Sequence, residues 1–170
     1  MEFVVLTGLS GAGKTVAMHS LEDMGFFCVD NLPPALIRVF YDLCQQAESG
    51  MARVAVVTDT RGGELFNSFF AALENLRAEE KPYKIVYLDA SHGVLVRRFK
   101  ETRRRHPLWE ESSLERAVEL EREMLRPMRE SADFVIDTSS LSPAQLKTRI
   151  SELFLGSPGS SMTVHCMSFG

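Results

Sequence analysis

The chain has 170 residues, a formal net charge of −4 and a pI near 5.6. This length suits one α/β domain with a substantial core, and the acidic balance argues against a protein that holds nucleic acid through its overall electrostatic field. Three cysteines at unrelated spacings suggest neither a disulfide framework nor a zinc site, and no stretch reaches the roughly 18 apolar residues that span a bilayer. We therefore expect a soluble protein of the cytoplasm, with no membrane partner.

Short apolar runs alternate with longer amphipathic stretches along the chain. In chain order, strands are predicted at residues 3–7, 26–29, 54–58, 85–88 and 134–136, and helices at 14–24, 34–48, 64–79, 93–104, 113–131 and 143–154. Runs rich in β-branched residues that are separated by helices indicate a parallel sheet covered on both faces. The predicted fold is a kinase-like P-loop NTPase domain over residues 1–155, a three-layer α/β/α structure with a five-stranded, mostly parallel sheet.

The first strand runs directly into a complete G-x-x-x-x-G-K-[ST] pattern, which is Gly8-Leu9-Ser10-Gly11-Ala12-Gly13-Lys14-Thr15. Its glycines allow backbone N–H groups to turn inward around a pyrophosphate at the positive end of the following helix. Lys14 is expected to reach the β- and γ-phosphates, and the Thr15 hydroxyl to bind Mg²⁺. The loop therefore predicts a site for ATP or GTP with Mg²⁺.

Two carboxylates follow predicted strands. Asp59 ends the apolar run at 54–58 in the manner of a Walker B aspartate, which would hold Mg²⁺, although it can also be read as a helix cap. Arg61, two residues later, could touch phosphate as well. Asp30 ends the second strand and should face the same crevice as the loop, where it could orient a water or an acceptor hydroxyl. The alternative for Asp30 is an Asx turn with Asn31, stiffened by two prolines.

The run from 97 to 105 is strongly basic and ends in Arg103, Arg104 and Arg105, just before His106 and Pro107. Such a run is often only a solvated helix face. However, a proline that stops a helix after three arginines is also typical of a lid whose guanidinium groups close over phosphates. His106 and Trp109 can be interpreted either as a stacking surface for a base or as the anchor of a lid hinge.

The C-terminal stretch changes in composition. Residues 156–161 are rich in Gly, Ser and Pro and are predicted to be a linker, and 162–170 form a new strand-like run that is expected to begin a second, truncated domain.

Several long motifs resemble the RapZ family of bacterial nucleotide-binding proteins, also called RNase adapter proteins. Besides the loop, the matches are Leu21-Glu22-Asp23-Met24-Gly25-Phe26-Phe27-Cys28-Val29-Asp30-Asn31-Leu32-Pro33, Glu101-Thr102-Arg103-Arg104-Arg105-His106-Pro107-Leu108 and Ala132-Asp133-Phe134-Val135-Ile136-Asp137-Thr138-Ser139. The resemblance covers essentially the whole chain. It implies the N-terminal domain of a two-domain protein.

The resemblance also implies an activity and partners. It implies binding and hydrolysis of ATP and GTP, with a second nucleotide segment at the D-x-R motif, here Asp59-Thr60-Arg61-Gly62, where the family usually has valine at the position of Thr60. In enteric members the full-length protein presents a small regulatory RNA to an endonuclease, mostly through the second domain, and a full-length oligomer is expected.

Three functions remain open at this point. The leading one is a regulatory nucleotide-binding domain with slow Mg²⁺-dependent NTPase activity, in which Lys14, Asp59 and the three arginines act on the phosphates and Asp30 positions the water. The second is a small-molecule kinase of the nucleotide or shikimate type. The third is an RNA-binding adapter whose conformation the nucleotide sets.

Overall fold

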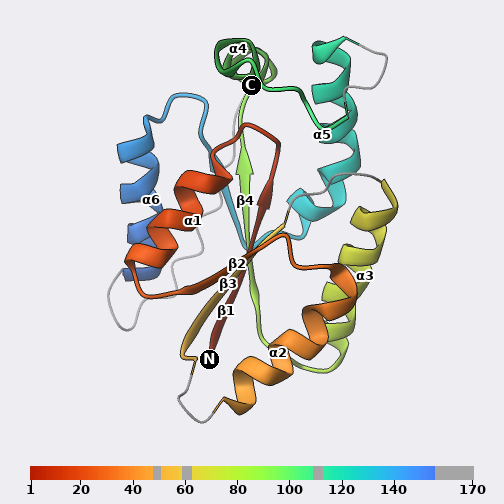
Figure 1. Ribbon diagram of the computed structural model, residues 1–170, viewed down its shortest axis with the longest axis vertical. Coiled ribbons are helices and arrows are strands. Elements are labelled where there is room, and N and C mark those ends of the chain that lie inside the picture. Colours follow the sequence, from red (N-terminus) through yellow and green to blue (C-terminus); the bar gives the residue numbers. More distant parts are fainter. Residues whose placement is uncertain (48–50, 59–62, 109–112, 156–170) are drawn as a thin grey trace.

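The computed structural model describes residues 1–47, 51–58, 63–108 and 113–155 (Figure 1). In chain order its elements are β1 (Glu2–Gly8), α1 (Lys14–Asp23), β2 (Phe27–Asp30), the 3₁₀ helix η1 (Pro34–Leu36), α2 (Ile37–Gln46), β3 (Arg53–Val57), α3 (Gly63–Ala78), β4 (Lys84–Asp89), α4 (His92–Thr102), α5 (Leu114–Glu130), β5 (Phe134–Asp137) and α6 (Pro143–Leu155).

The five strands form one parallel sheet in the order β2-β3-β1-β4-β5. β1 lies in the centre, where Val5 is in register with Val56 of β3 and Ile85 of β4, and all three side chains are buried. Strands that are buried on both faces consist of nearly continuous apolar runs, as β1, β3 and β4 do here. The predicted α/β class and five-stranded parallel sheet are confirmed.

Helices cover both faces of the sheet, so the domain has three layers (Figure 1). α1 and α6 pack together on one face, and α2, α3 and α5 cover the other. Aromatic contacts connect the layers: the Phe3 ring lies 4.9 Å from Tyr41 of α2, and Phe26 lies 5.4 Å from Phe154 of α6. No helix within the described residues is long and apolar enough to cross a membrane.

Two predicted helices differ from the structure at their ends. The helix predicted at 34–48 begins as the separate 3₁₀ turn η1, which starts at Pro34 directly after Pro33, and the α-helix α2 begins only at Ile37. The helix predicted at 93–104 ends at Thr102, because Arg103 adopts a left-handed backbone with φ 52°. The three arginines therefore follow α4 and do not form part of a helical face.

Candidate functional site

The loop at residues 8–15 (the phosphate loop) leaves the carboxyl edge of the sheet between β1 and α1. Gly8, Gly11 and Gly13 all have positive φ, at 137°, 82° and 107°, which L-residues with side chains rarely adopt. Gly8 also passes very close to β4, because a Cβ placed on it would lie 2.2 Å from the Leu88 carbonyl oxygen. A glycine is required here for the chain to leave the sheet in this direction.

The backbone N–H groups of the phosphate loop fall into two sets. Those of Leu9 and Ala12 donate to the Leu88 and Leu9 carbonyl oxygens, at 3.1 and 3.0 Å, and so stabilise the turn itself. For Gly11, Gly13 and Thr15, no acceptor is found among the described residues. Unpaired N–H groups at the positive end of a helix form a concave site that suits an anion.

The side chain of Lys14 folds back over the start of the phosphate loop. Its Nζ donates to the carbonyl oxygens of Gly8 at 2.7 Å and Leu9 at 3.3 Å. Thr15, the next residue, lies exposed in the first turn of α1. Among the described residues the loop thus has one cation, one exposed hydroxyl and three N–H groups without an acceptor, which is a donor set for phosphate and for a metal bound to phosphate.

Two side chains hold the phosphate loop from outside. The Arg98 guanidinium donates through Nη1 to the Gly11 carbonyl at 3.0 Å and through Nη2 to the Thr138 carbonyl at 2.7 Å. The Thr138 hydroxyl donates to the Ala12 carbonyl at 2.8 Å. These bonds fix the Gly11 and Ala12 carbonyls of the loop in place. Sequence reasoning missed both residues, although Thr138 lies within a motif that carries the family resemblance.

A buried carboxylate contacts the phosphate loop from α5. Glu121 accepts the Ser10 N–H at 3.0 Å and the Ser10 hydroxyl at 2.6 Å, and it pairs with His106 Nε2 at 3.1 Å. Burial raises the pKa of Glu121, but the hydrogen bonds from His106 and Ser10 and the charge of Lys14 outweigh burial, so the pKa lies below its ordinary value. Glu121 was not predicted, yet it has a sequence signal: it occupies a core position of an amphipathic helix, between Val118 and Leu125.

A second carboxylate fixes α5 to the end of β4. Asp89 accepts hydrogen bonds from Arg122 at 2.9 Å and from Arg129 at 2.9 Å, and it also caps the N–H of Ala90. These bonds set the position of α5, and therefore of Glu121, relative to the sheet.

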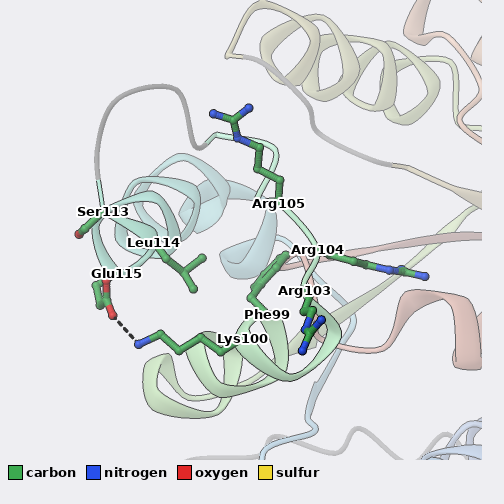
Figure 2. Close-up of a pocket in the computed structure, with 8 residues that line it drawn as sticks. All are labelled: Phe99, Lys100, Arg103, Arg104, Arg105, Ser113, Leu114 and Glu115. Atoms are coloured by element: carbon green, nitrogen blue, oxygen red, sulfur yellow. Dashed lines mark hydrogen bonds and ion pairs between the residues drawn. The ribbon is translucent and has the colours of Figure 1, made fainter.

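The arginine segment (residues 103–105) borders a cavity of about 560 Å³ between the end of α4 and the start of α5. Figure 2 shows that the three guanidinium groups point in different directions, while the Lys100–Glu115 ion pair, at 3.2 Å, lies at another edge of the cavity. Phe99 and Leu114 line the space between them. In this conformation the arginines do not converge on one point.

The remaining predicted residues lie partly outside the described structure. Asp30 is exposed at the end of β2, in register with Val57 of β3, and so stands at the carboxyl edge from which the phosphate loop departs. The following residue, Asn31, has φ 55°. The segment Asp59-Thr60-Arg61-Gly62 and Trp109 lie outside the described residues, as do the predicted linker at 156–161 and the run at 162–170.

Solved structures with similar folds include several small-molecule kinases. Shikimate kinase from Bacteroides thetaiotaomicron superposes with a TM-score of 0.60 at 20% identity, covering 89% of this chain and 96% of that chain. The tunicamycin resistance protein of Deinococcus radiodurans gives 0.61 at 17% identity, covering 91% of this chain and 95% of that one. At these identities the likeness establishes the P-loop kinase fold, and it is confined to the fold.

Relatives found by sequence identify the family of the chain, whereas the solved structures identify only its fold. A nucleotide-binding protein of Alkaliphilus oremlandii is 44% identical over the whole chain, and one of Caldanaerobacter subterraneus is 47% identical over the whole chain. The chain spans 59% and 60% of the length of these two relatives. Residues 1–158 match the family described as the RapZ-like N-terminal domain. The chain therefore belongs to the family of RapZ-like N-terminal domains.

Proposed function

We propose that this domain binds a nucleoside triphosphate with Mg²⁺ on the phosphate loop and hydrolyses it slowly, as a regulatory step. The observation that carries the proposal is the set of N–H groups at Gly11, Gly13 and Thr15, which have no acceptor among the described residues and lie at the N-terminus of α1. The Lys14 ammonium belongs to the same loop, where it donates to the Gly8 carbonyl oxygen at 2.7 Å. Nucleotide binding by the named relatives supports the same reading.

The chemistry of the donor set fits Mg²⁺ as well as phosphate. Within the described part of the chain, no three His, Cys, Asp or Glu side chains gather as a metal site. Mg²⁺ is commonly held by one or two protein oxygens, water and substrate phosphates, and an all-protein cage is not needed. Thr15 would supply the hydroxyl and Asp59 the carboxylate. When bound, Mg²⁺ would neutralise charge that develops on the phosphate oxygens.

The side chains of the site would have separate tasks. Lys14 would exchange the Gly8 and Leu9 carbonyls for β- and γ-phosphate oxygens, because a full negative charge is the better acceptor for an ammonium. Asp30 would orient the attacking water. The guanidinium groups of the arginine segment would turn from their present splayed arrangement to stabilise the transferred phosphoryl group, as lid arginines do in phosphoryl transfer.

Phosphate release from ATP and GTP, with and without Mg²⁺, tests this function. Lys14→Ala should lower the rate on the order of 100-fold, the usual cost of removing a transition-state donor. The matched control is Lys147→Ala, because Lys147 is an exposed lysine that pairs with Asp23 on α1. Equal rates for wild type, Lys14→Ala and the control would contradict the proposal.

A small-molecule kinase is the second candidate, favoured by the superposition on shikimate kinase and by the exposed Asp30 at the edge of the sheet. In that case Asp30 and Arg61 would hold an acceptor hydroxyl instead of a water. ATP labelled at the γ-phosphate, incubated with a panel of phosphorylatable metabolites, separates the two: stoichiometric transfer to any acceptor identifies a kinase, and release of free phosphate alone identifies an NTPase.

Partners belong to the whole protein, of which this chain spans about three fifths in its relatives. We propose that the full-length protein, as an oligomer, connects nucleotide binding with a small regulatory RNA and an endonuclease. If this domain itself contacts RNA through the arginine segment, its affinity will fall steeply with salt. Absence of salt-sensitive binding by the isolated domain would assign RNA contact elsewhere.

A further inference from the structure

Glu121 lies between the phosphate loop and the residues that directly follow the arginine segment. It is 2% exposed, and it receives both donors of Ser10 as well as the imidazole of His106, which is also 2% exposed. Ser10 belongs to the phosphate loop, and His106 directly follows Arg105. Two segments separated by almost 100 residues therefore share one buried charge.

The His106 imidazole is fixed by two hydrogen bonds. Its Nδ1 accepts the Leu108 N–H at 3.1 Å, so Nδ1 carries no proton, and Nε2 is the nitrogen that donates to Glu121. The ring also packs on Phe99, with centroids 5.0 Å apart. The imidazole cannot turn without breaking both bonds, so it holds the base of the arginine segment in place.

Phe99 makes a second connection to the phosphate loop. A Cβ built on Gly11 would lie 3.2 Å from Phe99 Cε2, so the ring that supports His106 also lies against Gly11 of the phosphate loop. His106 is thus in contact with the loop through Glu121 on one side and through Phe99 on the other.

Separating Glu121 from His106 costs free energy because the carboxylate is almost completely shielded from solvent. A buried charge that loses a hydrogen-bonded partner incurs a large desolvation penalty. If the arginine segment moved and took His106 with it, Glu121 would be left with Ser10 alone. A movement of the arginine segment would therefore change the two hydrogen bonds that Glu121 accepts from Ser10.

We propose that Glu121 is a positioning residue that aligns the arginine segment with the phosphate loop, fixing the loop through Ser10 and the segment through His106. The three arginines of the segment then act on bound phosphates only while Glu121 connects the arginine segment with the phosphate loop. This proposal rests on the NTPase function above, since the reaction that it aligns is cleavage of the terminal phosphoryl group.

A double-mutant cycle on phosphate release tests the proposal. Glu121→Gln keeps the shape of the side chain but removes its charge and leaves only one accepting oxygen, so at least one of the three bonds from Ser10 and His106 loses its acceptor. It should lower kcat on the order of 100-fold, the effect expected of small misplacements in an active site, and change KM by less than about tenfold. Replacing all three arginines by Ala should lower kcat in the wild-type background and change it less than about twofold in the Glu121→Gln background.

The control is Glu119→Gln, because Glu119 is an exposed carboxylate of the same helix, paired with Arg116 at 3.1 Å. It should leave kcat and the effect of the arginines unchanged. If Glu121→Gln does not fold, as judged by near-ultraviolet circular dichroism, the same cycle is run with Ser10→Ala, which removes only the hydroxyl bond and should still reduce the effect of the arginines.

The outcomes separate the two claims. An active wild type in which the arginine and Glu121 effects multiply independently overturns the positioning role and leaves the NTPase function standing. A wild type that neither binds nor hydrolyses nucleotide overturns the function itself.

Discussion

Three glycine-to-alanine substitutions separate the structural demands on the backbone. Gly8 has φ 137°, and an added Cβ would lie 2.2, 2.6 and 2.8 Å from the O, N and C atoms of Leu88. Gly25 has φ 83°, but nothing lies within 4 Å of its Cβ position. Gly93 has neither problem, because it lies in the first turn of α4 with open space around it.

The expected losses differ in size. At Gly8 the contacts are backbone atoms that cannot rotate away, so the ends of β1 and β4 must separate by about 1 Å to reach an ordinary 3.4 Å contact. Backbone strain costs about 1–3 kcal/mol and the lost Leu9 to Leu88 hydrogen bond about 1 kcal/mol. The sum is about 3 kcal/mol. Gly25→Ala should cost about 1 kcal/mol from the left-handed backbone alone, and Gly93→Ala should gain up to about 1 kcal/mol.

Urea unfolding followed by circular dichroism measures these free energies. From most to least stable, we expect the order Gly93→Ala, Gly25→Ala, Gly8→Ala. A Gly8→Ala variant as stable as Gly25→Ala would refute the close approach of the phosphate loop to β4.

Three further predictions concern side chains. The pKa of Glu121 in the folded protein lies below its unfolded value near 4.5, so the stability that Glu121 contributes is complete above that pH and is lost as the pH falls through the folded pKa. Glu121→Gln should therefore flatten the acid side of the plot of unfolding free energy against pH. An unchanged plot would contradict this. Burial, and secondarily the charge of Glu22, raises the pKa of the Cys28 thiol from 9.0 to about 11. Alkylation of Cys28 at pH 8, followed by peptide mass spectrometry, should therefore be about 100-fold slower than in the urea-unfolded chain. Equal rates in the two states would show that the thiol is accessible and its pKa is not raised. Arg98→Ala should cost about 1–3 kcal/mol in urea unfolding, because the Gly11 and Thr138 carbonyls lose their donor, whereas the exposed neighbour Arg97→Ala should change stability by less than about 0.5 kcal/mol; similar losses at both positions would argue against this role.

The sequence was informative wherever the signal is local. Apolar runs predicted all five strands to within one residue at each end, because strands buried on both faces need continuous apolar sequence. The phosphate loop was equally visible, because its glycines and Lys14 are consecutive in the chain. The position of Asp30 at the carboxyl edge of the sheet followed from the parallel topology alone.

Contacts between distant residues could not be predicted. Glu121 lies 111 residues from Ser10, and Arg98 lies 87 residues from Gly11. A carboxylate within a polar-rich helix shows nothing of its partner until the helices are packed. The end of α4 was misplaced for another reason: Arg103 adopts a left-handed backbone that is uncommon for a residue with a side chain, so the sequence predicted a continued helix.

Nucleotide-dependent thermal stabilisation tests the central claim most directly. Ligand at 100 times its dissociation constant should stabilise the domain by about 2.7 kcal/mol, which for a chain of this size raises Tm by about 5–11 °C. We predict this rise for the wild type and for Lys147→Ala with Mg²⁺ and ATP or GTP, and its loss in Lys14→Ala. An equal rise in Lys14→Ala, or no rise in the wild type at millimolar nucleotide, would contradict the assignment of the phosphate loop.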